Sequence, residues 1–96
     1  SFDGLQIDAV ARSVEVDGRQ VALTVREFDI LFHLASHPRQ VFAREQLLSS
    51  LWEDEFEGDA STVTVHVRRL RAKIEADASR PVHVRTVWGV GYKFEP

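Results

Sequence analysis

The segment spanning residues 61–74 holds the side chains best suited to chemistry with another molecule. It carries four cationic side chains and no carboxylate. At 100° per residue, its apolar residues fall on one face of a helix, and these are Val63, Val67, Leu70 and Ile74. The opposite face and its flanks carry Ser61, Thr62, Thr64, Val65, His66, Arg68, Arg69, Arg71, Ala72 and Lys73. Hydroxyls, a valine and arginines on one exposed face suit a helix that lies in the major groove of DNA.

Charge is distributed unevenly along the 96 residues. Residues 1–60 carry five arginines against twelve carboxylates, a net −7, whereas residues 61–96 carry seven basic groups against three carboxylates, a net +4. The acidic total of −3 therefore does not argue against an anionic partner, because the local patch sets the field that this partner meets. The same patch is also typical of a solvated basic face, or of a surface that binds an acidic protein.

Composition and length exclude several classes of protein. A hydrophobic content of 44% over 96 residues fits one folded domain. The absence of cysteine excludes disulfides and thiolate metal sites. No apolar run reaches the roughly 18 residues that span a membrane. Ser1 stands where an initiator methionine would, so we expect a piece of a longer chain.

The pair His33 and His37, four residues apart, would place two imidazoles on one helical face. No third ligand lies near them in the sequence, and His37 is placed to interact with a helix C-terminus. We therefore expect no metal site and no cofactor. His66 lacks a nucleophile or carboxylate at useful spacing, so we also expect that the chain is not an enzyme.

The N-terminal third predicts a sheet followed by a helix. Alternating apolar residues over residues 5–23 predict three or four short antiparallel strands, with a tight turn at Asp17-Gly18. Thr24 and Glu27 form a capping box that begins the first helix. Its inward face is expected to consist of Phe28, Leu31, Phe32 and Ala35.

The rest of the chain predicts two more helices and a hairpin. A second helix over residues 44–51 has Ala43 at its cap position, which supplies no side-chain acceptor. Five carboxylates within residues 53–59 indicate an exposed loop, and a third helix covers residues 61–76. Residues 82–94 predict two strands joined by a turn whose glycines permit positive φ. This order is that of a winged helix-turn-helix, an α+β fold.

Four ordered motifs resemble the DNA-binding effector domain of OmpR/PhoB-type response regulators. They cover residues 23–31, 41–48, 63–74 and 85–94. The resemblance extends over essentially all of residues 1–96, as one winged-helix effector domain without the N-terminal receiver domain of that family. It implies an N-terminal antiparallel sheet, three helices and a C-terminal β-hairpin wing.

The resemblance also implies roles for individual residues. Base contacts in the major groove would come from Thr62, Thr64, Val65 and Arg69. Phosphate contacts would come from Trp52, His66, Arg68, Arg71, Thr86 and Tyr92. The wing tip would comprise Trp88, Gly89, Gly91 and Lys93. The acidic loop, at the position that family members use to touch RNA polymerase, comprises Glu53, Asp54, Glu55, Phe56 and Glu57.

Three positions depart from the family pattern. Ser61 stands where some members have an arginine, and Ala43 replaces a common serine or threonine. Trp88 replaces a frequent arginine at the wing tip. We expect its indole to lie over the sugar–phosphate backbone or to pack on its own hairpin.

The implied function is sequence-specific binding of double-stranded DNA and regulation of transcription, as the output domain of a cytoplasmic two-component system. A sensor histidine kinase would act through the missing receiver domain. The full protein would then dimerise on direct-repeat half-sites and recruit RNA polymerase, whereas the isolated domain would be monomeric. No contact with a membrane is expected. Two alternatives stay open: the DNA-binding domain of a membrane-anchored transcriptional activator, and a winged-helix module that binds protein.

Overall fold

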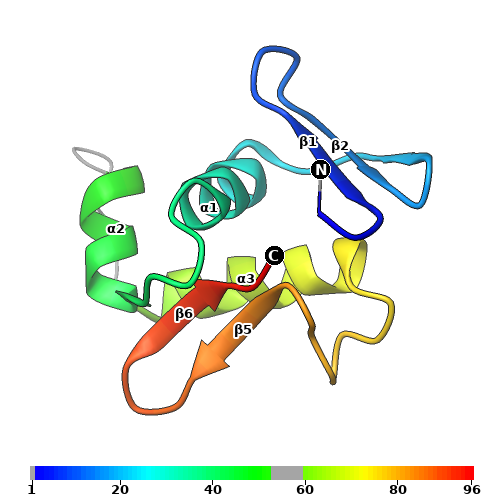
Figure 1. The fold of residues 1–96 in the computed structure, drawn as a ribbon. Coiled ribbons are helices and arrows are strands. Elements are labelled where there is room, and N and C mark those ends of the chain that lie inside the picture. The colour runs from blue at the N-terminus through cyan, green and yellow to red at the C-terminus, as the bar shows by residue number, and fades with distance from the viewer. Residues whose placement is uncertain (1, 53–59) are drawn as a thin grey trace.

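An antiparallel sheet in the order β1-β2-β3 opens the chain in the computed structural model, which describes residues 2–52 and 60–96. Its strands are β1 (Leu5–Asp8), β2 (Ser13–Val16) and β3 (Arg19–Val21) (Figure 1). Val16 pairs with Arg19, so Asp17 and Gly18 form the predicted two-residue turn. Both turn residues have positive φ, 50° and 82°, as a tight hairpin between twisted strands requires.

The first helix, α1 (Val25–Ala35), begins at the predicted capping box. Thr24 Oγ1 accepts a hydrogen bond from the N–H of Glu27 at 3.2 Å, and Glu27 Oε1 accepts one from the N–H of Thr24 at 3.0 Å. Two of the amide groups at the helix start therefore have partners that the local sequence alone supplies.

The buried face of α1 differs from the predicted one. Phe32 is 42% exposed, whereas Ile30 and Leu34 are fully buried beside Leu31. The prediction that Phe32 faces the core is therefore wrong. The physical reason is that α1 packs against α2, α3 and β6. Because neighbours lie on several sides of the helix, its buried face is wide and is centred on Ile30, Leu31 and Leu34, which leaves Phe32 at the edge.

The other two helices are α2 (Arg44–Trp52) and α3 (Ser61–Ile74). Ala43 offers no side-chain acceptor to α2, but its own N–H donates to Gln46 Oε1 at 2.7 Å. One half of a capping box is thus present where no cap was expected. α3 ends two residues earlier than predicted, because the backbone of Glu75 is extended, with φ −88° and ψ 142°.

The carboxylate of Glu75 fastens the end of α3 to the chain that follows it. Glu75 is buried and accepts hydrogen bonds from the N–H groups of Val82 at 2.9 Å, His83 at 3.2 Å and Val84 at 2.8 Å. Buried backbone donors need such acceptors. Glu75 therefore fixes where the C-terminal hairpin leaves the helix.

A second sheet, in the order β4-β6-β5, contains the C-terminal hairpin. Its strands are β4 (Phe42–Ala43), β5 (Val84–Val87) and β6 (Gly91–Phe94). The predicted positive φ is found at Gly89, at 80°, and the prediction is wrong at Gly91. A Cβ atom at Gly91 would lie 1.9 Å from the carbonyl oxygen of Phe42. Gly91 is required because β4 passes directly over it, not because of its backbone conformation.

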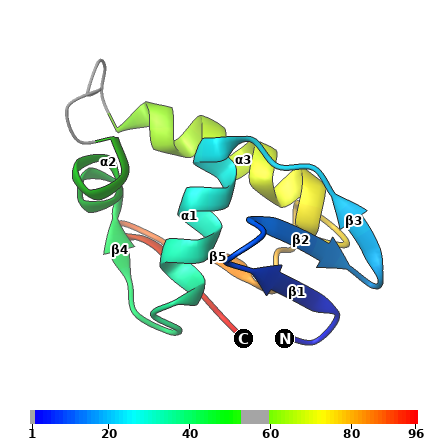
Figure 2. The ribbon, with the colours of Figure 1, turned by 90° about the horizontal axis from the view of Figure 1, so that it is seen from above.

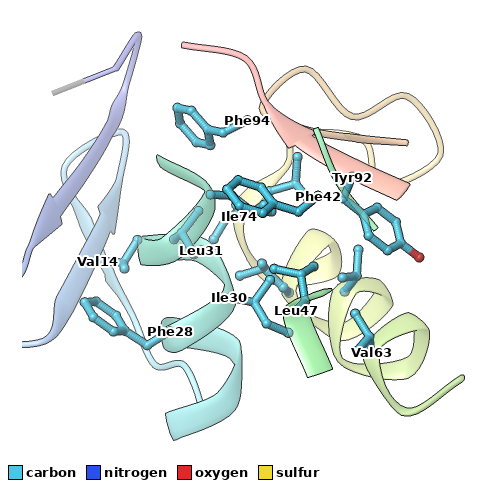
Figure 3. Close-up of a cluster of buried hydrophobic side chains, with 14 of the residues drawn as sticks. Val14, Phe28, Ile30, Leu31, Phe42, Leu47, Val63, Ile74, Tyr92 and Phe94 are labelled. Carbon is cyan, nitrogen blue, oxygen red and sulfur yellow. The ribbon is translucent and has the colours of Figure 1, made fainter. Parts of the chain in front are cut away.

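Within the described residues, side chains from both sheets and from α1, α2 and α3 share one core (Figure 3). Figure 2 shows α1 between the N-terminal sheet and α2, with α3 running from the α2 side of the molecule toward the sheet. The order of sheet, three helices and hairpin confirms the predicted winged helix-turn-helix fold. The core holds α3 along one side and leaves its outer face uncovered.

Candidate nucleic-acid interface

The two faces of α3 agree with the sequence-based prediction. Its inward residues are all buried, and they are Val63, Val67, Leu70 and Ile74. Its exposed residues are Ser61, Val65, Arg68, Arg69, Ala72 and Lys73, with Thr62, Thr64, His66 and Arg71 half-buried. Val65 is 42% exposed. The helix therefore presents an apolar side chain among hydroxyls and cations, which is the mixture that base edges and phosphates require.

Two arginines of α3 are free to meet an anion. Arg68 and Arg69 are exposed, and within residues 2–52 and 60–96 neither guanidinium has a carboxylate within salt-bridge distance. Lys73 differs from them, because its Nζ lies 2.7 Å from Glu27 Oε1. Burial raises the pKa of Glu27, but hydrogen bonds from Lys73 and Thr24 outweigh it and leave that pKa lowered. The charge of Lys73 is thus neutralised within the fold.

Arg71 connects α3 to the wing. Its Nε donates to the carbonyl oxygen of Val84 at 2.9 Å, and its Nη2 donates to Thr86 Oγ1 at 2.7 Å. The guanidinium carbon also lies 5.4 Å from the ring centroid of Tyr92. Burial lowers the pKa of Arg71. Arg71, Thr86 and Tyr92, which were all predicted to contact phosphate, therefore contact one another and connect α3 to the hairpin. Their contact with phosphate stays a prediction.

Arg44, at the start of α2, is a site residue that sequence reasoning missed. Its Nη1 donates to Thr64 Oγ1 at 3.2 Å, and Tyr92 Oη donates to the same oxygen at 3.5 Å. The hydroxyl of Thr64, predicted to contact a base, is thereby oriented from two sides. The available signal was an exposed cation in the first turn of α2, where a helix N-terminus does not favour positive charge.

Trp52 lies inside the core while touching the α3 face. The indole is 9% exposed, its ring centroid lies 5.4 Å from that of His66, and the guanidinium of Arg26 lies 4.9 Å above it. These contacts orient His66, another residue predicted to contact phosphate. Burial, followed by the charge of Arg69, lowers the pKa of His66, which favours the neutral form of its imidazole.

The burial of His33 and His66 predicts a loss of stability in acid. His33 Nε2 and His66 Nδ1 are buried, and neither has a hydrogen-bond partner in the described part of the chain. Burial, and for His33 also the charge of His37, lowers both pKa values. Protons then bind the unfolded chain, at a pKa of about 6.5, before the folded one. The free energy of unfolding should fall as the pH drops below about 6.5, by about 1 kcal/mol at most because both rings are partly exposed.

Urea unfolding between pH 5 and pH 8 measures this loss. The variants His33→Gln and His66→Gln should each show a smaller fall over that range than the wild-type chain. A fall of the same size in both variants would contradict the assignment to these two histidines.

The wing tip is a three-residue turn between β5 and β6. Trp88 is 90% exposed and Val90 is 56% exposed. Of the two placements expected for the indole, packing on its own hairpin is therefore wrong, and contact with the sugar–phosphate backbone stays a prediction. Lys93 does not belong to the tip, because it lies within β6 opposite Arg85. Its Nζ lies 3.2 Å from Glu95 Oε1. The chain completes its turn before Gly91, which leaves the tip apolar.

The acidic loop predicted to touch polymerase, Glu53 to Glu57, lies outside the described residues. Among the described residues, no group of three or more His, Cys, Asp or Glu side chains is placed to hold a metal ion. Nor does any described helix have the length and apolarity needed to cross a membrane.

Comparison with known proteins identifies the family. The family described as transcriptional regulatory protein, C terminal, matches residues 18–94. The transcriptional regulatory protein SrrA of Staphylococcus aureus is 50% identical over 95 residues, which are 98% of this chain and 39% of SrrA. The chain therefore spans well under half the length of this relative.

Solved structures agree with this assignment. The response regulator DrrB of Thermotoga maritima, an OmpR/PhoB homologue, has a TM-score of 0.93 and 38% identity, over 100% of this chain and 43% of DrrB. The RstA DNA-binding domain of Klebsiella pneumoniae, solved in complex with the RstA box, has a TM-score of 0.88 and 40% identity, over 100% of this chain and 95% of that domain. The chain belongs to the family of C-terminal domains of transcriptional regulatory proteins and has the OmpR/PhoB-type winged-helix fold.

Proposed function

We propose that the chain binds double-stranded DNA in a sequence-specific manner and regulates transcription as the output domain of a two-component response regulator. The observation that carries the proposal is the outer face of α3, on which Arg68 and Arg69 lie exposed beside Val65. The 40% identity to a domain solved in complex with its DNA box supports it. The geometry favours binding rather than catalysis.

The proposed roles divide along α3. Thr62, Thr64, Val65 and Arg69 would read base edges, and Arg68 would contact phosphate from the same face. Arg44 and Tyr92 hold the Thr64 hydroxyl in one orientation. A polar group that is oriented before binding loses less entropy when it meets a base.

Phosphate contacts fix the position of the helix on the duplex without reading its sequence. We assign them to Trp52, His66, Arg68, Arg71, Thr86 and Tyr92. Because a hydrogen bond already joins Arg71 to Thr86, the two side chains would offer phosphate a pre-formed site on the wing. His66, whose neutral form burial favours, would donate a hydrogen bond without adding charge.

The activity of the whole protein would follow from a joined receiver domain in the cytoplasm. A sensor histidine kinase would phosphorylate that receiver, and two chains would then occupy direct-repeat half-sites. Linking two modest binding modules raises avidity steeply without any new contact. Occupancy of the DNA would therefore follow phosphorylation, whereas each isolated domain would be a monomer that binds DNA more weakly.

A salt-dependent mobility shift on duplex DNA tests the proposed function. The duplex should be one that the chain selects from random sequence, with a shuffled duplex as control. We expect tighter binding to the selected duplex and an affinity that falls steeply with salt, because cations on α3 displace counterions from phosphate. A module that binds only protein would shift neither duplex, and that result would refute the proposal.

The acidic loop is expected to act on transcription rather than on DNA affinity. Replacing Glu53, Glu55 and Glu57 with glutamine should leave binding unchanged or slightly stronger, because these carboxylates repel phosphate. Activated transcription in vitro by the full-length regulator should fall if the loop meets RNA polymerase. Glu15→Gln, on the N-terminal sheet, is the matched control. Unchanged transcription by the triple variant would reduce the loop to a solubilising surface.

A further inference from the structure

We propose that Trp88 is the specificity-determining residue of the wing and enters the minor groove as an apolar wedge between base pairs. This inference rests on the proposed DNA binding and adds a preference that α3 does not supply. The wedge would select deformable pyrimidine–purine steps instead of the narrow A·T tracts that attract a cationic tip.

The exposure of Trp88 is the first observation. Its side chain is 90% exposed, and no ring or cation among the described residues packs on it. Trp52, by contrast, is 9% exposed between Arg26 and His66. An indole exposed to water next to the 56% exposed Val90 is typical of a surface that contacts another molecule.

The position of the tip is the second observation, and it selects DNA as the partner. A recess between α3 and the wing is lined by Thr64, Arg68, Arg71, Thr86 and Trp88, together with Ala78 and Tyr92. These hydroxyls and guanidinium groups suit one sugar–phosphate strand. A single strand separates the major groove from the minor groove. With α3 in the major groove and the strand in the recess, the tip lies in the minor groove.

The support of the tip is the third observation. Val87 pairs with Gly91 across the hairpin, and the N–H of Val90 donates to the carbonyl oxygen of Val87 at 2.9 Å. Gly89 has φ +80°, and nothing lies within 4 Å of where its Cβ would be. The turn therefore has a hydrogen bond of its own, which supports its backbone. A wedge needs such support, because unstacking a base step requires a side chain that cannot fold back.

The chemistry of indole explains the expected preference. A narrow A·T minor groove attracts cations through its negative potential, from which a neutral ring gains nothing. A wide ring gains instead from contact with base faces and sugars, which requires the groove to open. Opening is easiest at TA and CA steps, where stacking is weak. A tryptophan at the tip would therefore recognise flexible base steps through contact with base faces, whereas a cation would recognise a narrow groove through its negative potential.

Tryptophan fluorescence tests whether the indole is covered by DNA. Acrylamide quenching should report Trp88 in the free chain, while Trp88→Phe reports Trp52 alone. Adding the duplex selected from random sequence should reduce the quenching of Trp88 severalfold, and the Trp52 signal should change less. Binding of that duplex with unchanged quenching would overturn the inference and leave the proposed function intact.

Affinity measurements test the wedge. Duplexes should differ from the selected sequence at one base step at a time along its flanks, with an A·T tract replaced by TA or CA. We expect Trp88→Ala to bind about tenfold more weakly where a flexible step lies under the tip, and to lose less on an A·T tract. Trp88→Phe should behave more like the wild type. Val10→Ala, an exposed control in the turn between β1 and β2, should behave as the wild type.

The variant Trp88→Arg should reverse the preference. It should favour A·T tracts and depend more strongly on salt, because the new cation is drawn to phosphate and to the narrow groove. Equal losses for Trp88→Ala on every flank would overturn the wedge. Protection of Trp88 in the absence of DNA, rising with protein concentration, would overturn it in favour of contact between copies. Failure of the wild-type chain to bind any duplex would refute the proposed function, and the wedge with it.

Discussion

Replacing Gly91 with alanine should destabilise the chain by about 3 kcal/mol, the largest loss expected from any single substitution considered for this domain. The added Cβ would lie 1.9 Å from the carbonyl oxygen of Phe42 and 2.8 Å from the Cα of Ala43. Both atoms belong to backbone, which cannot rotate aside as a side chain can. β4 would have to separate from β6, and the ladder that connects the wing to the start of α2 would break.

Urea unfolding of Gly91→Ala beside Gly18→Ala measures this effect. Gly18 has φ +82° and nothing within 4 Å of its Cβ position, so its substitution introduces strain without a clash and should cost about 1 kcal/mol. If Gly91→Ala is no less stable than Gly18→Ala, close contact with β4 is not the reason for glycine at this position.

Replacing Arg69 with alanine should weaken binding to the selected duplex by about 1–3 kcal/mol and relax the preference at one base pair. The expected reason is the loss of the proposed bidentate contact with a base edge. Within residues 2–52 and 60–96 the guanidinium of Arg69 has no carboxylate partner, which leaves it available for that contact. Binding to random DNA should change much less. An equal loss on both kinds of DNA would show that Arg69 contacts phosphate instead.

Arg68→Ala is the matched control for Arg69→Ala, because both side chains are exposed on the same helix. It should weaken binding to all sequences similarly and reduce the salt dependence by about one phosphate contact. Arg71→Ala is expected to have the same effect on DNA, but it also removes the donors to Val84 and Thr86. Its thermal unfolding must therefore be measured alongside binding. Arg68→Ala, by contrast, leaves no acceptor without a donor in the part of the chain that the structure describes.

Local sequence determined the features whose physical cause spans only a few residues. The capping box at Thr24 and Glu27 and the turn at Asp17-Gly18 form as predicted, because neighbouring backbone groups satisfy them. The two faces of α3 also follow from helical spacing, since residues three or four apart share a side of any helix. These local signals predicted the order of the strands and helices, and the winged-helix fold was predicted from that order.

Only the tertiary structure decided which partners meet across the chain. Lys73 was predicted on a flank of the DNA-binding face, yet its charge is paired with Glu27, 46 residues away. Periodicity gives the angle of a side chain around its own helix but not the identity of the element packed there. The exposure of Phe32 follows from the same limit, because neighbours on several sides decide how wide the buried arc of α1 is.

The candidate site shows the same division. Sequence pattern located the cations and hydroxyls of α3, but it did not show that Arg44 orients Thr64 or that Arg71 bonds to Thr86, 15 residues further along. The sequence likewise did not predict why residue 91 must be glycine, because the cause is the backbone of β4, about 50 residues earlier in the chain. The exposure of Trp88 was also decided by tertiary structure, since among the described residues no other element packs over the turn between β5 and β6. Contacts of this kind depend on how separate elements dock, and docking is a property of the whole core rather than of any one segment.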